Sequence, residues 1–355
     1  MPKINRVNVK CAHREWDRPM RNFLQLVCAP LRLGCLFGLY FFSMNFVHAQ
    51  PQQNLPALAL VGYQAFALRV SDIDRSVRFY SDVFGAAPVR DAKRATYALG
   101  TSNQHFILSE AEGDEPLGFA WIGLGVRNFD RQAVSQALSQ LGFSPIEAQE
   151  QRPLTRAMRF WSDEKWGQDA LFFADAEGIV YRVMSTDDCG ACALAASSEG
   201  LLSAQGINHF TNFVANYERG NRLFFEGLGL GILAYQGPTS PTVSLGDGLQ
   251  FLMYVGGTDN SSPSVPGRTD HVSLSVAEFD VEAVRARLTA YGLVPSDGQR
   301  PPRALTHWVS LRQPNRGGVV GGTPEVYFSD PDGLAIQIQD AGYCGGGGYL
   351  GDQCD

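Results

Sequence analysis

The hydrophobic pattern of this chain recurs four times. Each repeat starts with a short β-prone run that ends in Val, and Asp, Asn or Glu follows two positions later, at Asp72, Asn128, Asn216 and Glu278. That polar position is typical of a helix cap. Apolar residues three and four positions apart then predict a helix. Each helix is predicted to end near a glycine 15 or 16 residues after the Val, namely Gly85, Gly142, Gly229 and Gly292.

Strand-like runs follow each helix, at 95–99 and 105–108, 171–173 and 179–183, 243–245 and 249–254, and 326–328 and 334–338. Two of these hairpins turn on Asp175-Ala-Glu-Gly178 and Asp330-Pro-Asp-Gly333, where Gly admits a positive backbone angle. The repeating unit is therefore strand, helix and about three strands, and the predicted class is α+β with four βαβββ modules. Residues 186–206, rich in Ala, Ser and Gly, separate the first two modules from the last two.

The composition is that of an ordinary globular protein. The chain has 355 residues, of which 45% are hydrophobic and 18% charged, so two domains with their own cores are expected. Residues 1–49 hold seven basic residues and two acidic ones, a net charge of +5. Because the whole chain carries −7, the remaining residues carry −12. An acidic body argues against nucleic acid as a partner.

The basic head is followed by an apolar run at 33–47 and by Val47-His48-Ala49. This order of basic, apolar and small residues predicts a secretory signal peptide over 1–49, with cleavage after Ala49. The mature protein would then be secreted or periplasmic and free of the membrane. A retained signal anchor is the alternative, because the run approaches the length of a bilayer span. Translation from Met20 is a further alternative.

Four cysteines follow the predicted cleavage point: Cys189, Cys192, Cys344 and Cys354. Export favours disulfides, and four cysteines allow three pairings. A Cys344–Cys354 bridge is favoured because the glycine-rich segment between the two closes easily into a loop. For Cys189 and Cys192, a structural linkage is favoured over a redox pair or half of a zinc site, since the sequence offers neither a second half-site nor a thioredoxin-like strand and helix.

Paired βαβββ units that end in Tyr327-Phe-Ser-Asp330-Pro-Asp-Gly333 resemble the vicinal oxygen chelate (VOC) superfamily, which includes glyoxalase I, extradiol ring-cleavage dioxygenases and fosfomycin and bleomycin resistance proteins. The resemblance covers about residues 62–340. It implies two open-barrel domains with metal ligands on the first and last strands. The predicted division is a linker at 50–61, domain 1 at 62–185, a linker at 186–206, domain 2 at 207–340 and a Gly/Cys-rich tail at 341–355.

The resemblance places candidate ligands residue by residue. In such proteins the first-strand ligand is a His seven residues before the helix-cap position, and the last-strand ligand, usually Glu, lies four residues after the Gly of the Asp-Pro-Asp-Gly turn. In modules one and three the last strand has no such turn, and its ligand position is placed from the apolar pattern, with less certainty, at His105 and Gln250. The N-terminal pair thus holds Ala65, His105, Trp121 and Arg182, which do not suit a divalent metal. The C-terminal pair holds His209, Gln250, His271 and Gln337. The resemblance therefore implies one divalent metal ion, Fe, Mn, Zn or Ni, in domain 2.

Gln337 departs from the family pattern, in which two His and one carboxylate suit Fe(II). An amide oxygen is still a ligand for a hard metal, but it leaves the charge of the ion uncompensated, which favours anionic substrates with two adjacent oxygens. The implied function is a metal-dependent isomerase, lyase or ring-cleaving dioxygenase that acts on such a small molecule. The alternative is a non-catalytic small-molecule-binding protein with a decayed metal site.

Three more residues are candidates for the site. Tyr327 occupies a place where extradiol enzymes resemble this chain in having a Tyr near the metal, so it is a candidate donor to a substrate oxyanion, or a packing residue. Glu325 shares the strand face of Tyr327 and is a candidate base or substitute ligand, although a solvent-facing Glu is the commoner outcome. His307 lies in the insertion 296–323, which is placed to cover the cleft, and is expected at the surface.

Overall fold

The computed structural model describes residues 55–147, 157–167, 169–190, 200–237, 240–261 and 265–346. The chain divides into two units, residues 1–50 and 51–355, and every described residue belongs to the second. The predicted signal peptide, its cleavage point and its alternatives lie outside the described residues. Among the described residues, no helix has the length and apolar character needed to span a membrane.

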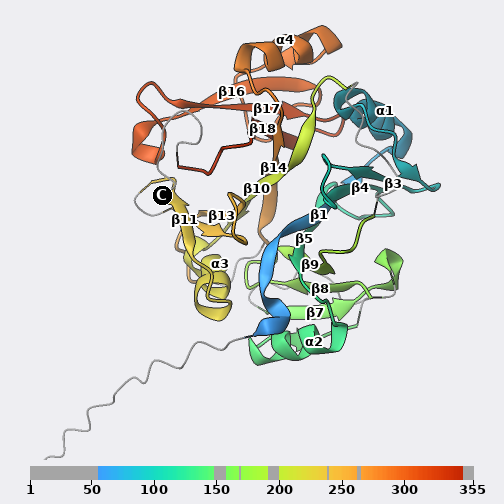
Figure 1. Cartoon of the computed structure of the whole chain (residues 1–355), viewed down its shortest axis with the longest axis vertical. Helices are drawn as coiled ribbons and strands as arrows, with labels where there is room; N and C mark the ends of the chain where they lie inside the picture. The colour runs from blue at the N-terminus through green and yellow to red at the C-terminus, as the bar shows by residue number, and fades with distance from the viewer. Residues whose placement is uncertain are drawn as a thin grey trace, which may run out of the picture. The chain divides into compact units, whose positions relative to one another are not determined.

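The described chain forms two nine-stranded sheets and a few helices (Figure 1). The first sheet consists of β1 (Leu60–Val70), β2 (Val89–Arg90), β3 (Arg94–Ala98), β4 (His105–Glu110), β5 (Gly118–Val126), β6 (Ser144–Pro145), β7 (Arg159–Ser162), β8 (Leu171–Ala174) and β9 (Val180–Ser185). The second consists of β10 (Ala204–Val214), β11 (Ile232–Tyr235), β12 (Pro241–Ser244), β13 (Phe251–Gly256), β14 (Arg268–Val276), β15 (Val294–Pro295), β16 (Thr306–Arg312), β17 (Thr323–Ser329) and β18 (Ala335–Asp340). The helices are α1 (Ile73–Phe84), α2 (Arg131–Gln140), α3 (Tyr217–Arg222) and α4 (Val281–Tyr291), with short turns η1 (Pro56–Leu58), η3 (Glu164–Trp166), η4 (Leu223–Gly227) and η5 (Pro314–Arg316).

Each sheet is built from two consecutive modules. The strand orders are β2-β3-β4-β1-β5-β9-β8-β7-β6 and β11-β12-β13-β10-β14-β18-β17-β16-β15. The first strands of the two modules pair antiparallel at the centre, as β1 with β5 and β10 with β14, and each pairs parallel with the last strand of its own module. The predicted α+β class and the pairing of modules one with two and three with four are therefore confirmed.

The helix caps follow the predicted pattern in two of the four modules. Asp72 caps α1 and Asn216 caps α3, each through its side-chain oxygen. In the other two modules the caps are Asp130 and Asp280, so the predicted caps there, Asn128 and Glu278, are wrong. Both of those residues instead have a positive φ, 53° and 52°, because the strand reverses in a turn before the helix begins.

The two sheets share one hydrophobic core. The ring of Phe210 on β10 meets Tyr63 and Phe66 on β1 edge-on, with centroid distances of 4.9 and 5.7 Å. On the outer side, α4 packs on β16 and β17 (Figure 1). The central strands β1 and β10 therefore touch directly, while the predicted domain boundaries at 62–185 and 207–340 stay predictions.

Two glutamines link β1 to β10 in a symmetric way. Gln250 accepts the backbone N–H of Tyr63 and donates to the carbonyl of Ile207, at 2.8 and 2.7 Å. Gln104 does the reverse, accepting from the N–H of Ile207 and donating to the carbonyl of Tyr63, both at 2.8 Å. A Cβ at Gly62 would lie 2.4 Å from the Gln250 oxygen, so only glycine leaves room for this bridge.

The turn between β8 and β9 docks on the start of α3. The Glu177 carboxylate accepts the backbone N–H groups of Ala215 and Asn216, at 3.0 and 3.1 Å, and forms an ion pair with Arg219. Because the exposed N–H groups of a helix start carry partial positive charge, a carboxylate is the favoured partner there. Residues of the first sheet thus hold a helix of the second.

The turn between β17 and β18 makes the corresponding contact with α1. The Asp332 carboxylate accepts the backbone N–H of Ser71 at 2.9 Å and its hydroxyl at 2.6 Å, and forms an ion pair with Arg75. The two acidic turns therefore fasten the two halves of residues 51–355 to each other at two points related by the internal repeat.

The first aspartate of each turn is buried and faces a tyrosine of the other half. Asp175 accepts from Tyr254, and Asp330 accepts from Tyr80 at 3.1 Å. Burial raises the pKa of Asp175 to about 6 and that of Asp330 to about 7, although hydrogen bonds from their own turns oppose the shift. Both carboxyls therefore titrate within the pH range in which most proteins are stable.

Candidate functional site

A cavity of about 390 Å³ opens on the second sheet. Its lining comes from β10, β13, β14, β17 and β18, from the connection between β11 and β12, and from the segment between β15 and β17. The lining residues are His209, Thr211, Phe213, Gln236, Ser240, Met253, Val255, Asp270, His271, Arg300, Ser310, Arg316, Glu325, Tyr327 and Gln337. Five of the six predicted site residues are among them, so strands far apart in sequence bring His209, His271, Gln337, Glu325 and Tyr327 together.

His209 on β10 and His271 on β14 converge in this cavity. Their ring centroids lie 5.6 Å apart and the rings are nearly perpendicular, at 81°. Both residues are buried. Burial, with the nearby charges of His271 and Arg312, holds the pKa of His209 well below its usual value, and a hydrogen bond to Gln337 opposes that shift only in part. His209 is therefore neutral near pH 7, the form in which an imidazole binds metal.

Each histidine is oriented by the residue immediately before it. His209 donates from Nδ1 to the Asn208 side-chain oxygen at 2.8 Å, and His271 donates from Nδ1 to the Asp270 carboxylate at 2.9 Å. The Nε2 atom of His271 is buried and has no hydrogen-bond partner among the described residues. These bonds engage Nδ1 of both rings, so Nε2 is the nitrogen of each ring that could bind a metal, and that of His209 has Gln337 as its neighbour.

Sequence reasoning missed both of these partners. The signal was present as two dipeptides at the same position of two repeats, Asn208-His209 and Asp270-His271. Burial alone would raise the pKa of Asp270, but the hydrogen bond from His271 and the charges of Arg300 and Arg268 lower it. Asp270 is therefore an anion beside the pocket.

Gln337 on β18 lies opposite Ser273 of β14 and Tyr327 of β17. Its side chain is within hydrogen-bonding reach of His209 and Tyr343, and its amide nitrogen has no further partner among the described residues. Two imidazole nitrogens and one amide oxygen thus face one cavity and suit a divalent metal. The described residues contain no cluster of three or more His, Cys, Asp or Glu side chains poised for a metal, because the third member here is an amide.

Gln250 does not belong to this group, so the prediction that it is a ligand is wrong. The residue paired with His209 on the neighbouring strand is Phe251, whose ring stacks on the His209 ring at a centroid distance of 4.2 Å. A shift of one residue along a strand moves a side chain to the other face. Gln250 therefore points to the junction with β1 and bridges Tyr63 and Ile207.

Replacing Gln250 by Leu is expected to lower the free energy of unfolding by about 2 kcal/mol, because the N–H of Tyr63 and the carbonyl of Ile207 each lose a partner. Metal content should stay that of the parent protein. Urea unfolding and elemental analysis measure the two quantities. Gln104→Leu, at the repeat-related position, is the matched control with the same expected loss. A variant at 250 that folds but loses metal would restore the ligand assignment.

Glu325 is buried at the cavity wall, so the expectation of a solvent-facing side chain is wrong. Its carboxylate accepts from Arg312 Nε at 3.0 Å, from the Tyr343 hydroxyl at 2.7 Å and from the Tyr327 hydroxyl at 3.2 Å. Arg312 is itself fully buried. Burial, followed by the charge of Glu325, raises the pKa of both tyrosines well above the usual value, so both keep their protons.

Residues 62–209 match the sequence profile of the Glyoxalase/Bleomycin resistance protein/Dioxygenase superfamily. This segment belongs to the VOC superfamily. The rest of the described chain repeats the same βαβββ arrangement, as the matching strand orders of the two sheets show. The resemblance inferred from the four repeats is therefore confirmed.

Solved structures give the same VOC fold over most of the chain. An extradiol ring-cleaving dioxygenase from B. fuscum is 18% identical, with a TM-score of 0.57, covering 85% of this chain and 77% of its own. Homoprotocatechuate 2,3-dioxygenase from Arthrobacter globiformis is also 18% identical, with a TM-score of 0.57 and coverages of 85% and 86%. The Mn(II)-bound glyoxalase from Novosphingobium aromaticivorans is 16% identical, with a TM-score of 0.53 and coverages of 81% and 86%. None of the curated proteins matches the sequence.

In the first sheet, the positions equivalent to His209, His271 and Gln337 are occupied by Ala65, Trp121 and Arg182. Ala65 pairs with His105 on the neighbouring strand. The guanidinium of Arg182 lies over the ring of Trp121, 5.3 Å from its centroid, and over that of Phe172 at 5.9 Å. An arginine and stacked aromatic rings thus occupy the space where the second sheet places His271 and Gln337.

The insertion 296–323 contributes Arg300, Ser310 and Arg316 to the lining of the 390 Å³ cavity on the second sheet, called the VOC pocket below. The Arg300 guanidinium forms an ion pair with Asp270 and lies over the rings of Trp308 and Tyr327, 5.4 and 5.2 Å from their centroids. His307, expected at the surface, is buried instead, and its Nε2 bonds to the hydroxyl of Thr289 at 2.9 Å. The insertion therefore brings a positive charge to the pocket through Arg300.

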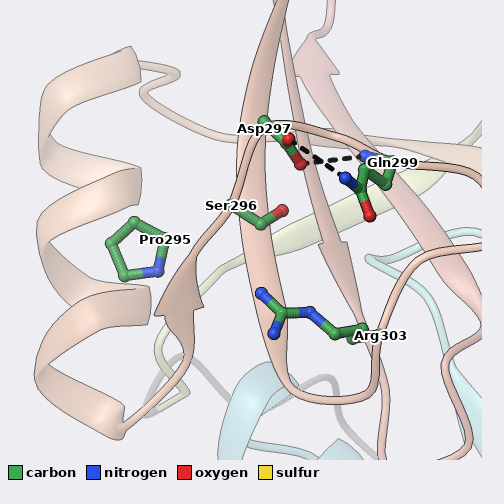
Figure 2. Close-up of a pocket in the computed structure, with 5 residues that line it drawn as sticks. All are labelled: Pro295, Ser296, Asp297, Gln299 and Arg303. Carbon is green, nitrogen blue, oxygen red and sulfur yellow. Dashed lines mark hydrogen bonds between the residues drawn. The ribbon is translucent and has the colours of Figure 1, made fainter.

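A second, open cavity of about 650 Å³ is formed mainly by the start of the same insertion, and its lining residues are Pro295, Ser296, Asp297, Gln299 and Arg303 (Figure 2). Asp297 accepts the backbone and side-chain N–H groups of Gln299, both at 3.4 Å. None of the six predicted site residues lines this cavity, so the VOC pocket is the candidate functional site.

Two of the four cysteines fall within the described residues. Cys189 and Cys344 are both disulfide-bonded, and Cys192 and Cys354 lie outside the described residues. The favoured Cys344–Cys354 pairing and the structural link at Cys189-Gly-Ala-Cys192 therefore stay predictions.

Proposed function

We propose that this chain is a metal-dependent VOC enzyme whose His209, His271 and Gln337 hold a divalent metal ion, Fe, Mn, Zn or Ni. The observation that carries the proposal is the pair of buried imidazoles, each held at Nδ1 by its preceding residue and each presenting Nε2 to one cavity. Similarity to extradiol dioxygenases and to a Mn(II)-bound glyoxalase supports it. When bound, the ion would act as a Lewis acid towards oxygen atoms of the substrate.

The charges around the pocket favour an anionic substrate. Arg300 and Arg316 line it, and Arg268 and Arg312 form ion pairs with its two carboxylates, Asp270 and Glu325. The arginines thus outnumber the carboxylates at the site before any metal binds. A small molecule with two adjacent oxygens and a negative charge would complement these positive side chains. Such a molecule is the proposed substrate of an isomerase, lyase or ring-cleaving dioxygenase.

Tyr327 and Glu325 are the candidate acid–base residues of this site. The Tyr327 hydroxyl lines the cavity, keeps its proton and touches the Glu325 carboxylate. It is therefore a candidate donor of a hydrogen bond to a substrate oxyanion, while the neighbouring Glu325 carboxylate is the candidate base that would take a proton from the substrate. Arg312 and the Tyr343 hydroxyl hold the Glu325 carboxylate in position at the cavity wall.

Metal content tests the proposal. Purified without chelator, the parent protein is expected to retain about one divalent ion per chain. His209→Ala and His271→Ala should each weaken Mn²⁺ binding by more than the roughly 10–100-fold that loss of an outer partner costs. His105→Ala, which removes a buried imidazole of the first sheet, is the matched control and should bind as the parent does. A parent protein that binds none of Fe, Mn, Zn and Ni would contradict the proposal of a metalloenzyme.

A second candidate is a non-catalytic binding protein, favoured by the absence of a carboxylate from the ligand set of the described residues. On this hypothesis the same arginine-rich cavity binds a small anion without metal. Isothermal titration of the metal-free protein with an anionic catechol separates the two. Equal affinity with and without Mn²⁺ favours the binder, and metal-dependent affinity favours the enzyme.

We also propose that the protein is exported, with cleavage after Ala49, on the strength of the basic, apolar and small-residue order of 1–49. N-terminal sequencing of the protein recovered outside the cytoplasm of a bacterial host should read from Gln50. A product that keeps Met1 or begins at Met20 would contradict this.

A further inference from the structure

The segment after the last strand, Ala341–Gly345, returns to the pocket. A tight turn reverses the chain, with the N–H of Gly342 and that of Tyr343 bonded to Asp340 at 2.7 and 3.1 Å. Tyr343 is then fully buried beside His209, with ring centroids 5.6 Å apart and planes 27° from parallel. The predicted Gly/Cys-rich tail 341–355 therefore begins inside the site.

The backbone of this segment fixes the orientation of the Asn208 side-chain amide. The carbonyl oxygen of Tyr343 accepts the Asn208 side-chain N–H at 2.7 Å, so the amide nitrogen of Asn208 must face the tail. The amide oxygen then faces His209 Nδ1, at 2.8 Å. Because that oxygen only accepts, a neutral His209 bonded to it carries its proton on Nδ1, and its Nε2 lone pair is on the side of Gln337 and the cavity.

The tautomer of His271 does not depend on a contact of this kind. His271 Nδ1 faces the Asp270 carboxylate, whose two oxygens both accept, so the tautomer is set whichever way the carboxylate turns. An amide at the equivalent position specifies a tautomer only if another contact fixes which of its oxygen and nitrogen faces the histidine. In this protein the Tyr343 carbonyl does so, and Arg312, which donates to the carbonyl of Gly345, holds the segment in place.

We propose that Ala341–Gly345 is a working part of the pocket and that Tyr343, acting through its carbonyl and Asn208, is a positioning residue that selects the ligating tautomer of His209. The inference rests on the proposed metal site for its consequence in binding, but the tautomer itself exists without metal. The two ideas therefore fail in different experiments.

Nitrogen NMR of the metal-free full chain labelled with ¹⁵N-histidine, at pH 8, reads the tautomer directly, with His209→Gln to assign its signals among the six histidines. His209 should carry its proton on Nδ1. Asn208→Leu, similar in volume but unable to accept, should shift the population towards the Nε2–H form and weaken Mn²⁺ binding about 10–100-fold. Asn208→Asp keeps an acceptor beside Nδ1 but loses the donor to the Tyr343 carbonyl, so it should retain the Nδ1–H tautomer of His209.

Tyr343→Phe is the matched control, because it removes the hydroxyl and keeps the backbone carbonyl, so the His209 tautomer should stay unchanged. The His271 signals should not move in any of these variants. A parent with the proton on His209 Nε2, or an Asn208→Leu variant with parental tautomer and Mn²⁺ affinity, overturns the inference. If the tautomer responds as stated but the parent binds no Mn²⁺, the proposed function fails and the positioning role stands.

Discussion

Replacing Arg312 by Met is expected to lower the free energy of unfolding by about 3–5 kcal/mol, the cost of leaving a buried charge without its partner. Arg312 is 0% exposed and Glu325 is 6% exposed, and Arg312 Nε donates to the carboxylate at 3.0 Å. Met has a similar length and no charge, so the carboxylate of Glu325 would remain in the protein interior with only two tyrosine hydroxyls to stabilise it. Urea unfolding at pH 7 measures the difference.

Two further variants separate this electrostatic cost from lost packing. Adding Glu325→Gln to Arg312→Met removes the unpaired charge and should recover most of the loss, since the amide oxygen still accepts from one tyrosine hydroxyl and the amide N–H can donate to the oxygen of the other. Arg285→Met breaks the exposed pair with Glu282, whose side chains are 40% and 78% exposed, and should cost less than about 1 kcal/mol. If the double variant is no more stable than Arg312→Met alone, the loss comes from packing and the electrostatic explanation is wrong.

The sequence pattern predicted the parts of the site that follow the repeat. His209 and His271 stand at the same position of two modules, and the strands that carry them lie side by side, so their convergence was predictable from periodicity and resemblance. Gln337 was found through the turn at Asp330, which fixes the phase of β18. The last strand of module three, β13, has no such marker, and an error of one residue there placed the predicted ligand at Gln250 and not at the position of Phe251.

Other parts of the site depend on contacts that no local pattern announces. Arg312 meets Glu325 because β16 and β17 pair antiparallel in one particular register, and Tyr343 returns to His209 after the sheet has ended. The two bridges by Gln104 and Gln250 and the docking of the acidic turns likewise join residues more than thirty positions apart. Periodicity identifies which face a side chain occupies within a module, but it carries no information on which distant face lies opposite.

Asp330→Asn is expected to remove a pH dependence of stability worth about 4 kcal/mol. Burial raises the pKa of Asp330 from 3.8 to about 7, so between these values the folded protein binds a proton that the unfolded chain has released. Stability therefore falls as pH rises from about 4 to about 7, by about 1.4 kcal/mol per pH unit for this one group. Urea unfolding of parent and variant at pH 4.5, 6 and 8 should show a difference that grows with pH in favour of the variant.

The substitution is suited to this test because the asparagine keeps the contacts of the turn. Its oxygen still accepts the N–H groups of Asp332 and Leu334, and its amide nitrogen can donate to the Tyr80 hydroxyl. Asp114→Asn, on an exposed loop, removes one carboxylate without altering this contact and should leave the parental pH profile unchanged. Parallel profiles for the parent and Asp330→Asn would mean that Asp330 is charged in the folded protein throughout this range. In that case the contact between the β17–β18 turn and α1 would include a second buried anion, and acid rather than base would weaken it.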